Sequence, residues 1–65
     1  MGNGYFMEDQ TLFATTDMAW LVGEDEADAT WVPQSVILNT DIDEIDQVGY
    51  LEVEMWWAKK RGLES

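Results

Sequence analysis

The chain contains neither cysteine nor histidine in its 65 residues. No disulfide can staple the fold, a reducing compartment is compatible, and zinc lacks the ligands that it prefers in structural sites. A domain of this size buries only about 60% of the surface of its unfolded chain. Its core must therefore come from large apolar side chains, among them four tryptophans. We expect one small domain over residues 1–65, with residues 1–10 loosely ordered.

Charge is distributed very unevenly along the chain. Thirteen acidic residues and no lysine or arginine occur in residues 1–58, and the basic triplet of residues 59–61 then follows. The formal net charge is −11. This field disfavours direct binding to nucleic acid or to an anionic membrane and favours a basic protein partner.

Targeting signals are not evident. The N-terminus has no basic region followed by an apolar run, so no signal peptide is expected. No stretch approaches the roughly 20 apolar residues of a membrane-spanning helix. Gly2 would suit myristoylation, but Phe6 stands where serine or threonine is needed. We expect a soluble protein of the cytoplasm.

Alternation of apolar and polar residues predicts strands. It extends over residues 11–22, and a break near Asp17 would divide this segment into two strands. Residues 30–38 are rich in β-branched and aromatic side chains and predict a further strand. Pro33 cannot donate a ladder hydrogen bond, so this strand lies at an edge or bends there. Residues 48–53 form the last predicted strand.

Residues 54–61 predict a short helix. The basic triplet in its last turn suits the negative end of the helix dipole, and an alternative is a contact between this triplet and an acidic loop. Gly62 is placed to be the C′ residue, with Leu63 available for the accompanying apolar contact. We therefore expect an α+β fold, with a small antiparallel sheet of three to four strands and one C-terminal helix packed on a face.

Two acidic clusters occupy the predicted loops after residues 23 and 39. Rows of carboxylates there would resemble the phosphates of DNA, which carry one charge per roughly 1.7 Å of duplex. They would bind lysine and arginine through charge-assisted hydrogen bonds and steer association. The alternative is that these loops only keep the protein soluble. The clusters are Glu24, Asp25, Glu26 and Asp28, and Asp41, Asp43, Glu44 and Asp46.

The second cluster, within DIDEID, also resembles the start of a calcium-binding loop. Counted from Asp41, carboxylates stand at the first, third and twelfth positions, the last being Glu52. Ile45 replaces a ligand at the fifth position, and Asp46 replaces the glycine at the sixth. Weak calcium binding is therefore an alternative, and we assign no metal ligand.

The tryptophans are expected mainly in the core, above all Trp20, Trp31 and Trp56. Two adjacent tryptophans cannot point the same way on a short helix, so either Trp56 or Trp57 should be exposed. Tryptophan is enriched among binding hot spots, and we take Trp57 as the candidate anchor for a partner.

Three segments carry a resemblance to a class of small phage-encoded proteins: AWLV (19–22), WVPQS (31–35) and WWAKKRGL (56–63). Those proteins have a strand, a W-[IV]-P-x-S strand and a closing W-x-A-x-K-x-G-L helix, and the similarity covers residues 17–63. This chain departs from the pattern by its long acidic connection after Gly23 and by Trp57. A tiny, acidic phage protein without cysteine also resembles the anti-CRISPR proteins and the DNA-mimicking anti-restriction proteins, which bind host nucleases or surveillance complexes and are not enzymes.

The resemblance implies a phage or mobile-element inhibitor that blocks target-DNA binding by a CRISPR–Cas surveillance complex in the bacterial cytoplasm. A type I complex is the leading case, and the partner would be its basic DNA-binding surface. A DNA mimic directed at a restriction enzyme or nucleoid protein is one alternative, and a calcium-binding structural phage module is another. No catalytic signature or cofactor is expected, because paired carboxylates would need a deep cleft for glycoside hydrolysis. A monomer is favoured, with a dimer as the alternative.

Overall fold

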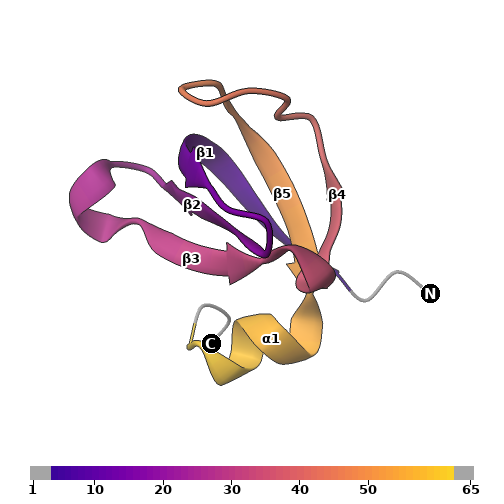
Figure 1. Cartoon of the computed structure of the whole chain (residues 1–65). Helices are drawn as coiled ribbons and strands as arrows, with labels where there is room; N and C mark the ends of the chain where they lie inside the picture. The colour runs from indigo at the N-terminus through magenta and orange to yellow at the C-terminus, as the bar shows by residue number, and fades with distance from the viewer. Residues whose placement is uncertain (1–3, 63–65) are drawn as a thin grey trace.

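The structure, a computed structural model, describes residues 4–62. Within this range the chain forms one antiparallel sheet of five strands in the order β3-β2-β1-β5-β4 (Figure 1). The α+β class and the single helix are confirmed, but the sheet has five strands instead of three to four. The elements are β1 Gly4–Thr15, β2 Ala19–Gly23, η1 Glu26–Asp28, β3 Thr30–Pro33, η2 Gln34–Val36, β4 Ile37–Thr40, β5 Val48–Glu54 and α1 Met55–Lys60, where η denotes a 3₁₀ turn.

The strand β1 begins earlier than the sequence indicated. Residues 1–10 were expected to be loosely ordered, which is wrong for residues 4–10, because they pair with β5 along one edge. Met7 lies opposite Leu51, and both are buried. Residues 1–3 lie outside the described range. The early start is stabilised by burial of alternate side chains against β5.

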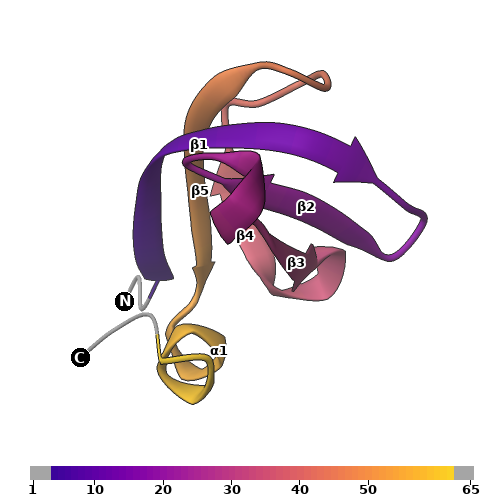
Figure 2. The ribbon, with the colours of Figure 1, turned by 90° about the vertical axis from the view of Figure 1, so that its left-hand side faces the viewer.

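A bulge in the middle of β1 hides this alternation in the sequence. The register with β5 shifts between Met7 and Gln10, and Asp9 adopts a positive φ of 58°. The buried Gln10 side chain donates a hydrogen bond from Nε2 to the carbonyl oxygen of Glu8, at 3.0 Å. Glu8 and Asp9 are therefore displaced toward solvent. Figure 2 shows how strongly β1 bends along its length.

The predicted break near Asp17 is confirmed by the turn between β1 and β2. Thr16 Oγ1 accepts hydrogen bonds from the backbone N–H groups of Met18 and Ala19, at 3.2 and 3.0 Å. The Thr16 N–H donates to the Ala19 carbonyl oxygen at 2.8 Å. One threonine side chain thus reverses the chain direction.

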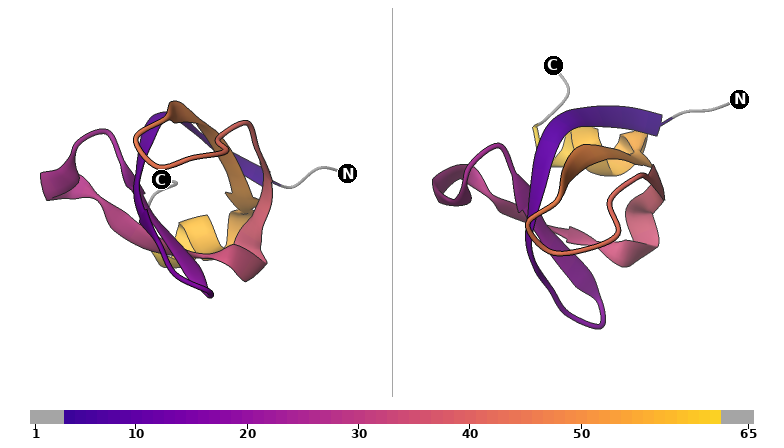
Figure 3. Two further views of the ribbon diagram at one scale, coloured as in Figure 1. Left: turned by 45° about the horizontal axis from the view of Figure 1, so that its top comes forward. Right: turned by 90° about the horizontal axis from the view of Figure 1, so that it is seen from above.

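The sheet is curled because η2 joins its two edges. A 3₁₀ turn advances only about 2 Å per residue, so Pro33 at the end of β3 and Ile37 at the start of β4 are about 8 Å apart. The edges of a flat five-stranded sheet would be separated by about 19 Å. The sheet therefore forms an open barrel, which is visible end-on in Figure 3. Both parts of the Pro33 prediction are confirmed, since β3 is an edge strand and the chain bends after it.

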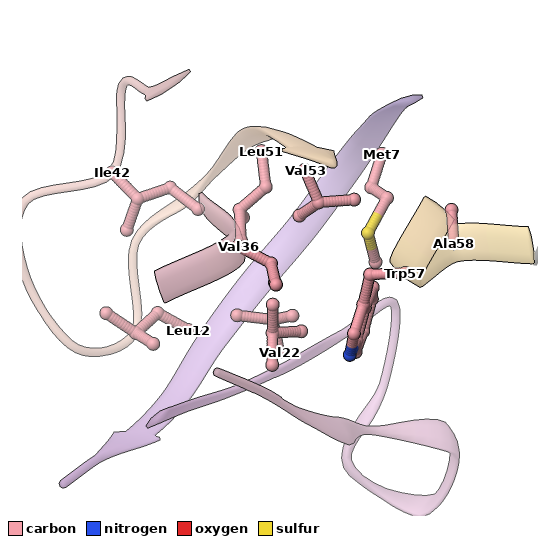
Figure 4. Packing of buried hydrophobic residues seen from close by; sticks show 10 residues of the cluster. Met7, Leu12, Val22, Val36, Ile42, Leu51, Val53, Trp57 and Ala58 are labelled. Carbon is pink, nitrogen blue, oxygen red and sulfur yellow. The ribbon is translucent and has the colours of Figure 1, made fainter. Parts of the chain in front are cut away.

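The core fills this barrel and is mostly aliphatic. Figure 4 shows Trp57 beside Met7 at one end of the buried cluster, with Ile42 and Leu12 at the other end. The helix α1 therefore closes one end of the barrel, and a loop residue closes the opposite end. The buried apolar residues are Met7, Leu12, Val22, Val32, Val36, Ile42, Leu51, Val53, Trp57 and Ala58.

The expected tryptophan core is largely wrong. All four tryptophans lie within the described range, but Trp31 and Trp56 are exposed and Trp20 is partly buried. Val32 faces the core from β3, so the preceding Trp31 points to the opposite side of this strand. Small aliphatic side chains suit the narrow interior of the barrel better than indole rings do.

The end of α1 follows the predicted cap. Gly62 has a φ of 78°, and its N–H donates to the Lys59 carbonyl oxygen at 3.1 Å. Lys59 and Lys60 lie in the last turn as expected. Arg61 instead donates from its guanidinium to Thr30 Oγ1 at 3.0 Å, and its Cζ lies 5.7 Å from the Trp57 ring centroid. The predicted apolar contact of Leu63 lies outside the described residues.

Candidate functional site

The first acidic loop connects β2 to β3, and its four predicted carboxylates are all exposed. Asp25 caps η1, because its Oδ1 accepts a hydrogen bond from the N–H of Asp28 at 3.1 Å. Gly23 permits the narrow base of the loop, since a Cβ there would stand only 2.7 Å from Ala29 Cα. Asp25 therefore has a structural role, whereas Glu24 and Glu26 are left to face solvent.

The second acidic loop, residues 41–47, is organised by one amide side chain. Gln47 Oε1 accepts hydrogen bonds from the N–H groups of Asp43 and Glu44, at 2.7 and 3.2 Å, and its Nε2 donates to the Asp41 carbonyl oxygen at 3.2 Å. Asp46 occupies the left-handed region with a φ of 75°. The sharp turn that was expected to need glycine is thus made by aspartate, one of the residues that tolerate this region.

This loop is also tied to the sheet. The N–H of Asp46 donates to the Leu12 carbonyl oxygen at 2.7 Å, and the N–H of Leu12 donates to the Gln47 carbonyl oxygen at 3.1 Å. Asp41 Oδ1 accepts a hydrogen bond from the N–H of Tyr50 at 2.9 Å. Together with the buried Ile42, these bonds hold the backbone of the loop and the Asp41 carboxylate against the sheet.

The two loops leave the sheet on either side of β1. Leu12 pairs with Val22 of β2 on one side and bonds to residues 46 and 47 on the other. Two strand spacings, about 10 Å, therefore separate the places where the loops join the sheet. From there the loops diverge, as Figure 1 shows. All eight predicted carboxylates are exposed on these two loops.

The bulge of β1 adds acidic residues that the sequence analysis missed. Glu8 and Asp9 are exposed between the two loops. Glu8 lines a cleft of about 300 Å³ together with Glu24 and Asp28. It also lines a groove of about 450 Å³ together with Asp9 and Asp41. Glu8 therefore joins the two acidic loops into one surface, which we call the acidic surface. The adjacent pair Glu8–Asp9, interrupting an otherwise alternating segment, was the only sequence signal for it.

The prediction that Trp57 anchors a partner is wrong. Its side chain is only 6% exposed, whereas that of Trp56 is 56% exposed. The reason is the geometry of α1, in which successive side chains are rotated by about 100°. Trp57 faces the barrel interior, and Trp56 consequently faces solvent. Trp57 supports the fold and is not available to a partner.

The calcium-binding hypothesis gains no support from the geometry. Within residues 4–62 no group of three or more acidic side chains is arranged to hold a metal ion. Glu52, the residue at the twelfth loop position, lies inside β5 opposite Phe6. The turn closes at Gln47, so the chain is already extended before it reaches this glutamate. The loop therefore has the carboxylates of a calcium site without the fold of one.

Moderate salt is expected to stabilise the protein. The carboxylates of the acidic surface repel one another, and ions screen exposed charges beyond about 10 Å at 0.1 M. Raising sodium chloride from 10 to 150 mM should therefore raise the melting temperature by several degrees, since about 1 kcal/mol corresponds to 4–8 °C in a domain of this size. Circular dichroism at constant pH measures the shift. A melting temperature that falls steadily over this range would contradict mutual repulsion.

No helix in residues 4–62 is long and apolar enough to cross a bilayer. Comparison of the chain with protein-family models, with curated proteins and with solved structures gives no match.

Proposed function

We propose that this protein is a phage or mobile-element inhibitor that occupies the DNA-binding surface of a CRISPR–Cas surveillance complex in the bacterial cytoplasm. The observation that carries the proposal is the acidic surface, in which Glu8 lies between two acidic loops that each contain internal hydrogen bonds. Carboxylates held in this way meet the lysine and arginine side chains that otherwise contact DNA phosphates. Target DNA is then excluded by charge and by volume, with no catalytic step.

The internal hydrogen bonds of the two loops support this mechanism. A flexible acidic tail loses conformational entropy when it binds, and this lowers its affinity. Here Asp25 caps one loop, and Gln47 makes three hydrogen bonds in the other. The backbone that carries the carboxylates is therefore ordered before a partner arrives. Arginine then forms charge-assisted, often bidentate bonds with them.

The position of the cations supports it as well. The three basic residues of the chain are consecutive, at positions 59–61. Lys59 and Lys60 belong to α1 at the end of the barrel, and no lysine or arginine is among the residues that line the two hollows of the acidic surface. Arg61 bonds to Thr30 at the margin of the cleft of about 300 Å³, so a single cation stands beside the acidic residues of that cleft. The negative field that remains accelerates association with a basic partner, and the acceleration falls as salt rises.

The test is an order-of-addition experiment with a purified type I surveillance complex and its target DNA. The protein is added before or after the DNA, and DNA binding is followed by mobility shift. Inhibition is expected only when the protein is added first. The double variant Glu26→Lys/Glu44→Lys should lose about tenfold or more in inhibitory potency, because it reverses one charge in each acidic loop.

A matched control separates position from total charge. The variant Asp17→Lys/Glu54→Lys has the same net charge of −7, since each pair of reversals adds four to −11. Asp17 lies in the turn between β1 and β2, and Glu54 precedes α1, both away from the two acidic loops. This control should inhibit like the unaltered protein at equal ionic strength. An equal loss of inhibitory potency in both variants would mean that inhibition depends only on total charge. Normal DNA binding in both orders of addition would overturn the proposal for that complex.

The same acidic surface would also fit the basic groove of a restriction enzyme or a nucleoid protein, which is the alternative target. Salt-sensitive binding to one of these proteins, together with unimpaired DNA binding by the surveillance complex, would favour that assignment. The same pair of charge variants applies to either target.

A further inference from the structure

One part of the acidic surface is not only charged but also aromatic. The groove of about 450 Å³ is formed on the outer side of β1 and β5 by Phe6, Val48, Gly49 and Tyr50, with Glu8, Asp9 and Asp41 also lining it. We call it the aromatic groove. Figure 1 shows β4, β5 and β1 side by side here, while α1 lies at the end of the barrel and leaves this outer side uncovered.

The apolar part of the groove has no role in the core. Met7 faces the interior of the barrel, so the neighbouring Phe6 faces outward. Phe6 is 54% exposed and Val48 59% exposed. The rings of Phe6 and Tyr50 lie together, with centroids 6.0 Å apart and planes inclined by 37°. The groove therefore presents an exposed phenylalanine beside a partly buried tyrosine, outside the core of the barrel.

Backbone geometry places three acidic residues around this pair, and one of them is bonded through its carboxylate. The bulge that contains Glu8 and Asp9 is fixed by the hydrogen bond from Gln10 Nε2 to the Glu8 carbonyl oxygen. Asp41 lies over Gly49, where any Cβ would collide with its Oδ1 and stand 2.8 Å from Ile42 Cγ1. The bond from the Tyr50 N–H uses one oxygen of the Asp41 carboxylate. A side chain at position 49 would therefore displace Asp41 or Ile42 from its place beside the groove.

We propose that the aromatic groove receives an arginine side chain of the basic partner, in preference to lysine. The inference rests on the proposed function, because it names the group that the acidic surface recognises. A guanidinium is planar and weakly hydrated, so it stacks on aromatic rings while its N–H groups bind carboxylates. An ammonium group is compact and strongly hydrated, and it gains less from an aromatic surface. Phe6 and Tyr50 supply the stacking surface, and the three carboxylates supply the charge.

The experiment uses two blocked peptides, tri-arginine and tri-lysine, as probes of equal charge. Each is titrated into ¹⁵N-labelled full-length protein at low salt, and the amide shifts give both affinity and location. Tri-arginine is expected to bind about threefold or more tightly than tri-lysine, the scale of an exposed cation–π contact. Its largest shifts should fall on Phe6, Gly49 and Tyr50. The variant Phe6→Ala should abolish this preference while tri-lysine binding stays nearly unchanged.

Trp56→Ala is the matched control, because it removes an exposed aromatic side chain from α1, away from the groove. It should keep the full preference for arginine. Equal affinities for both peptides, or tri-arginine shifts confined to residues 24–28 and 43–46, would overturn the assignment of the groove. An arginine preference in a protein that fails the order-of-addition test would retain the groove and reject the proposed target. Inhibition with no arginine preference would retain the proposed target and reject the assignment of the groove.

Discussion

Trp57→Ala is expected to lower the free energy of unfolding by about 3–5 kcal/mol, the range for removal of a buried aromatic side chain. Domains of this size have a total stability of about 3–10 kcal/mol. The ring lies beside Met7 at the end of the barrel that α1 closes, as Figure 4 shows, and the Arg61 guanidinium lies over it. Without the indole the helix loses its main contact with the sheet, so much of the population should be unfolded at 37 °C.

The adjacent tryptophan provides the control for this experiment. Trp56→Ala removes an equally large side chain from the same helix, but from its exposed side. Its effect should stay within about 0.5 kcal/mol, as is usual for surface positions. Urea titration followed by circular dichroism measures both variants against the unaltered protein. Equal destabilisation by the two substitutions would show that α1 is not docked through Trp57.

Ile42→Ala is expected to cost about 2–5 kcal/mol and to loosen the second acidic loop. Ile42 is only 3% exposed, and its N–H donates to Thr40 Oγ1 at 3.1 Å. It is the buried residue of segment 41–47, and it packs into the core at the end of the barrel opposite α1. Hydrogen exchange should therefore accelerate at Asp43 and Tyr50, whose N–H groups are bonded to side chains of this loop.

The control for this second experiment lies three residues further along the loop. Ile45 is 50% exposed, so Ile45→Ala should change stability by less than about 0.5 kcal/mol and leave amide protection intact. If the acidic loop owes its shape to Ile42, the two variants must differ in both measurements. Unchanged exchange in Ile42→Ala, at a measurable loss of stability, would mean that Gln47 and the backbone bonds hold the loop without the core contact.

Local signals were read correctly from the sequence. The α+β class followed from the residue pattern within each segment. The cap at Gly62 and the break near Asp17 depend on residues that are close in the chain. The bend after Pro33 involves proline, which lacks an N–H and has a fixed φ, and the adjacent 3₁₀ turn of Gln34–Val36. These features were predictable because the residues that determine them are close in the chain.

Non-local features were not predictable in the same way. The bulge at Glu8 and Asp9 interrupts the alternation of β1, so residues 4–10 resembled a loose segment. The division of residues 30–38 into two strands follows from the closure of the sheet, which no short window reveals. Burial of the tryptophans was wrong for a related reason, because the barrel interior admits few large rings.

The candidate site likewise combines local features, which were predictable from the sequence, with non-local features, which were not. The eight predicted carboxylates are exposed because they lie in loops, and this could be predicted from the sequence. The placement of the two loops relative to one another could not be predicted, because it arises from the pairing of β1 with β2 on one side and with residues 46–48 on the other. Phe6 and Tyr50 are 44 positions apart (50 − 6), and only the β1–β5 pairing brings them into one groove.

The turn η2 has a consequence for how this protein behaves at high concentration. A sheet with long free edges recruits further copies of itself by strand addition, which leads to fibres and precipitates. Here each edge strand has four residues, β3 ends in a proline that donates no hydrogen bond, and η2 turns the two edges toward each other. Exposed apolar residues on these strands, Trp31 and Leu38, therefore lack a long template for growth. Strand addition from one copy of the chain to another is therefore disfavoured at both edges of the sheet.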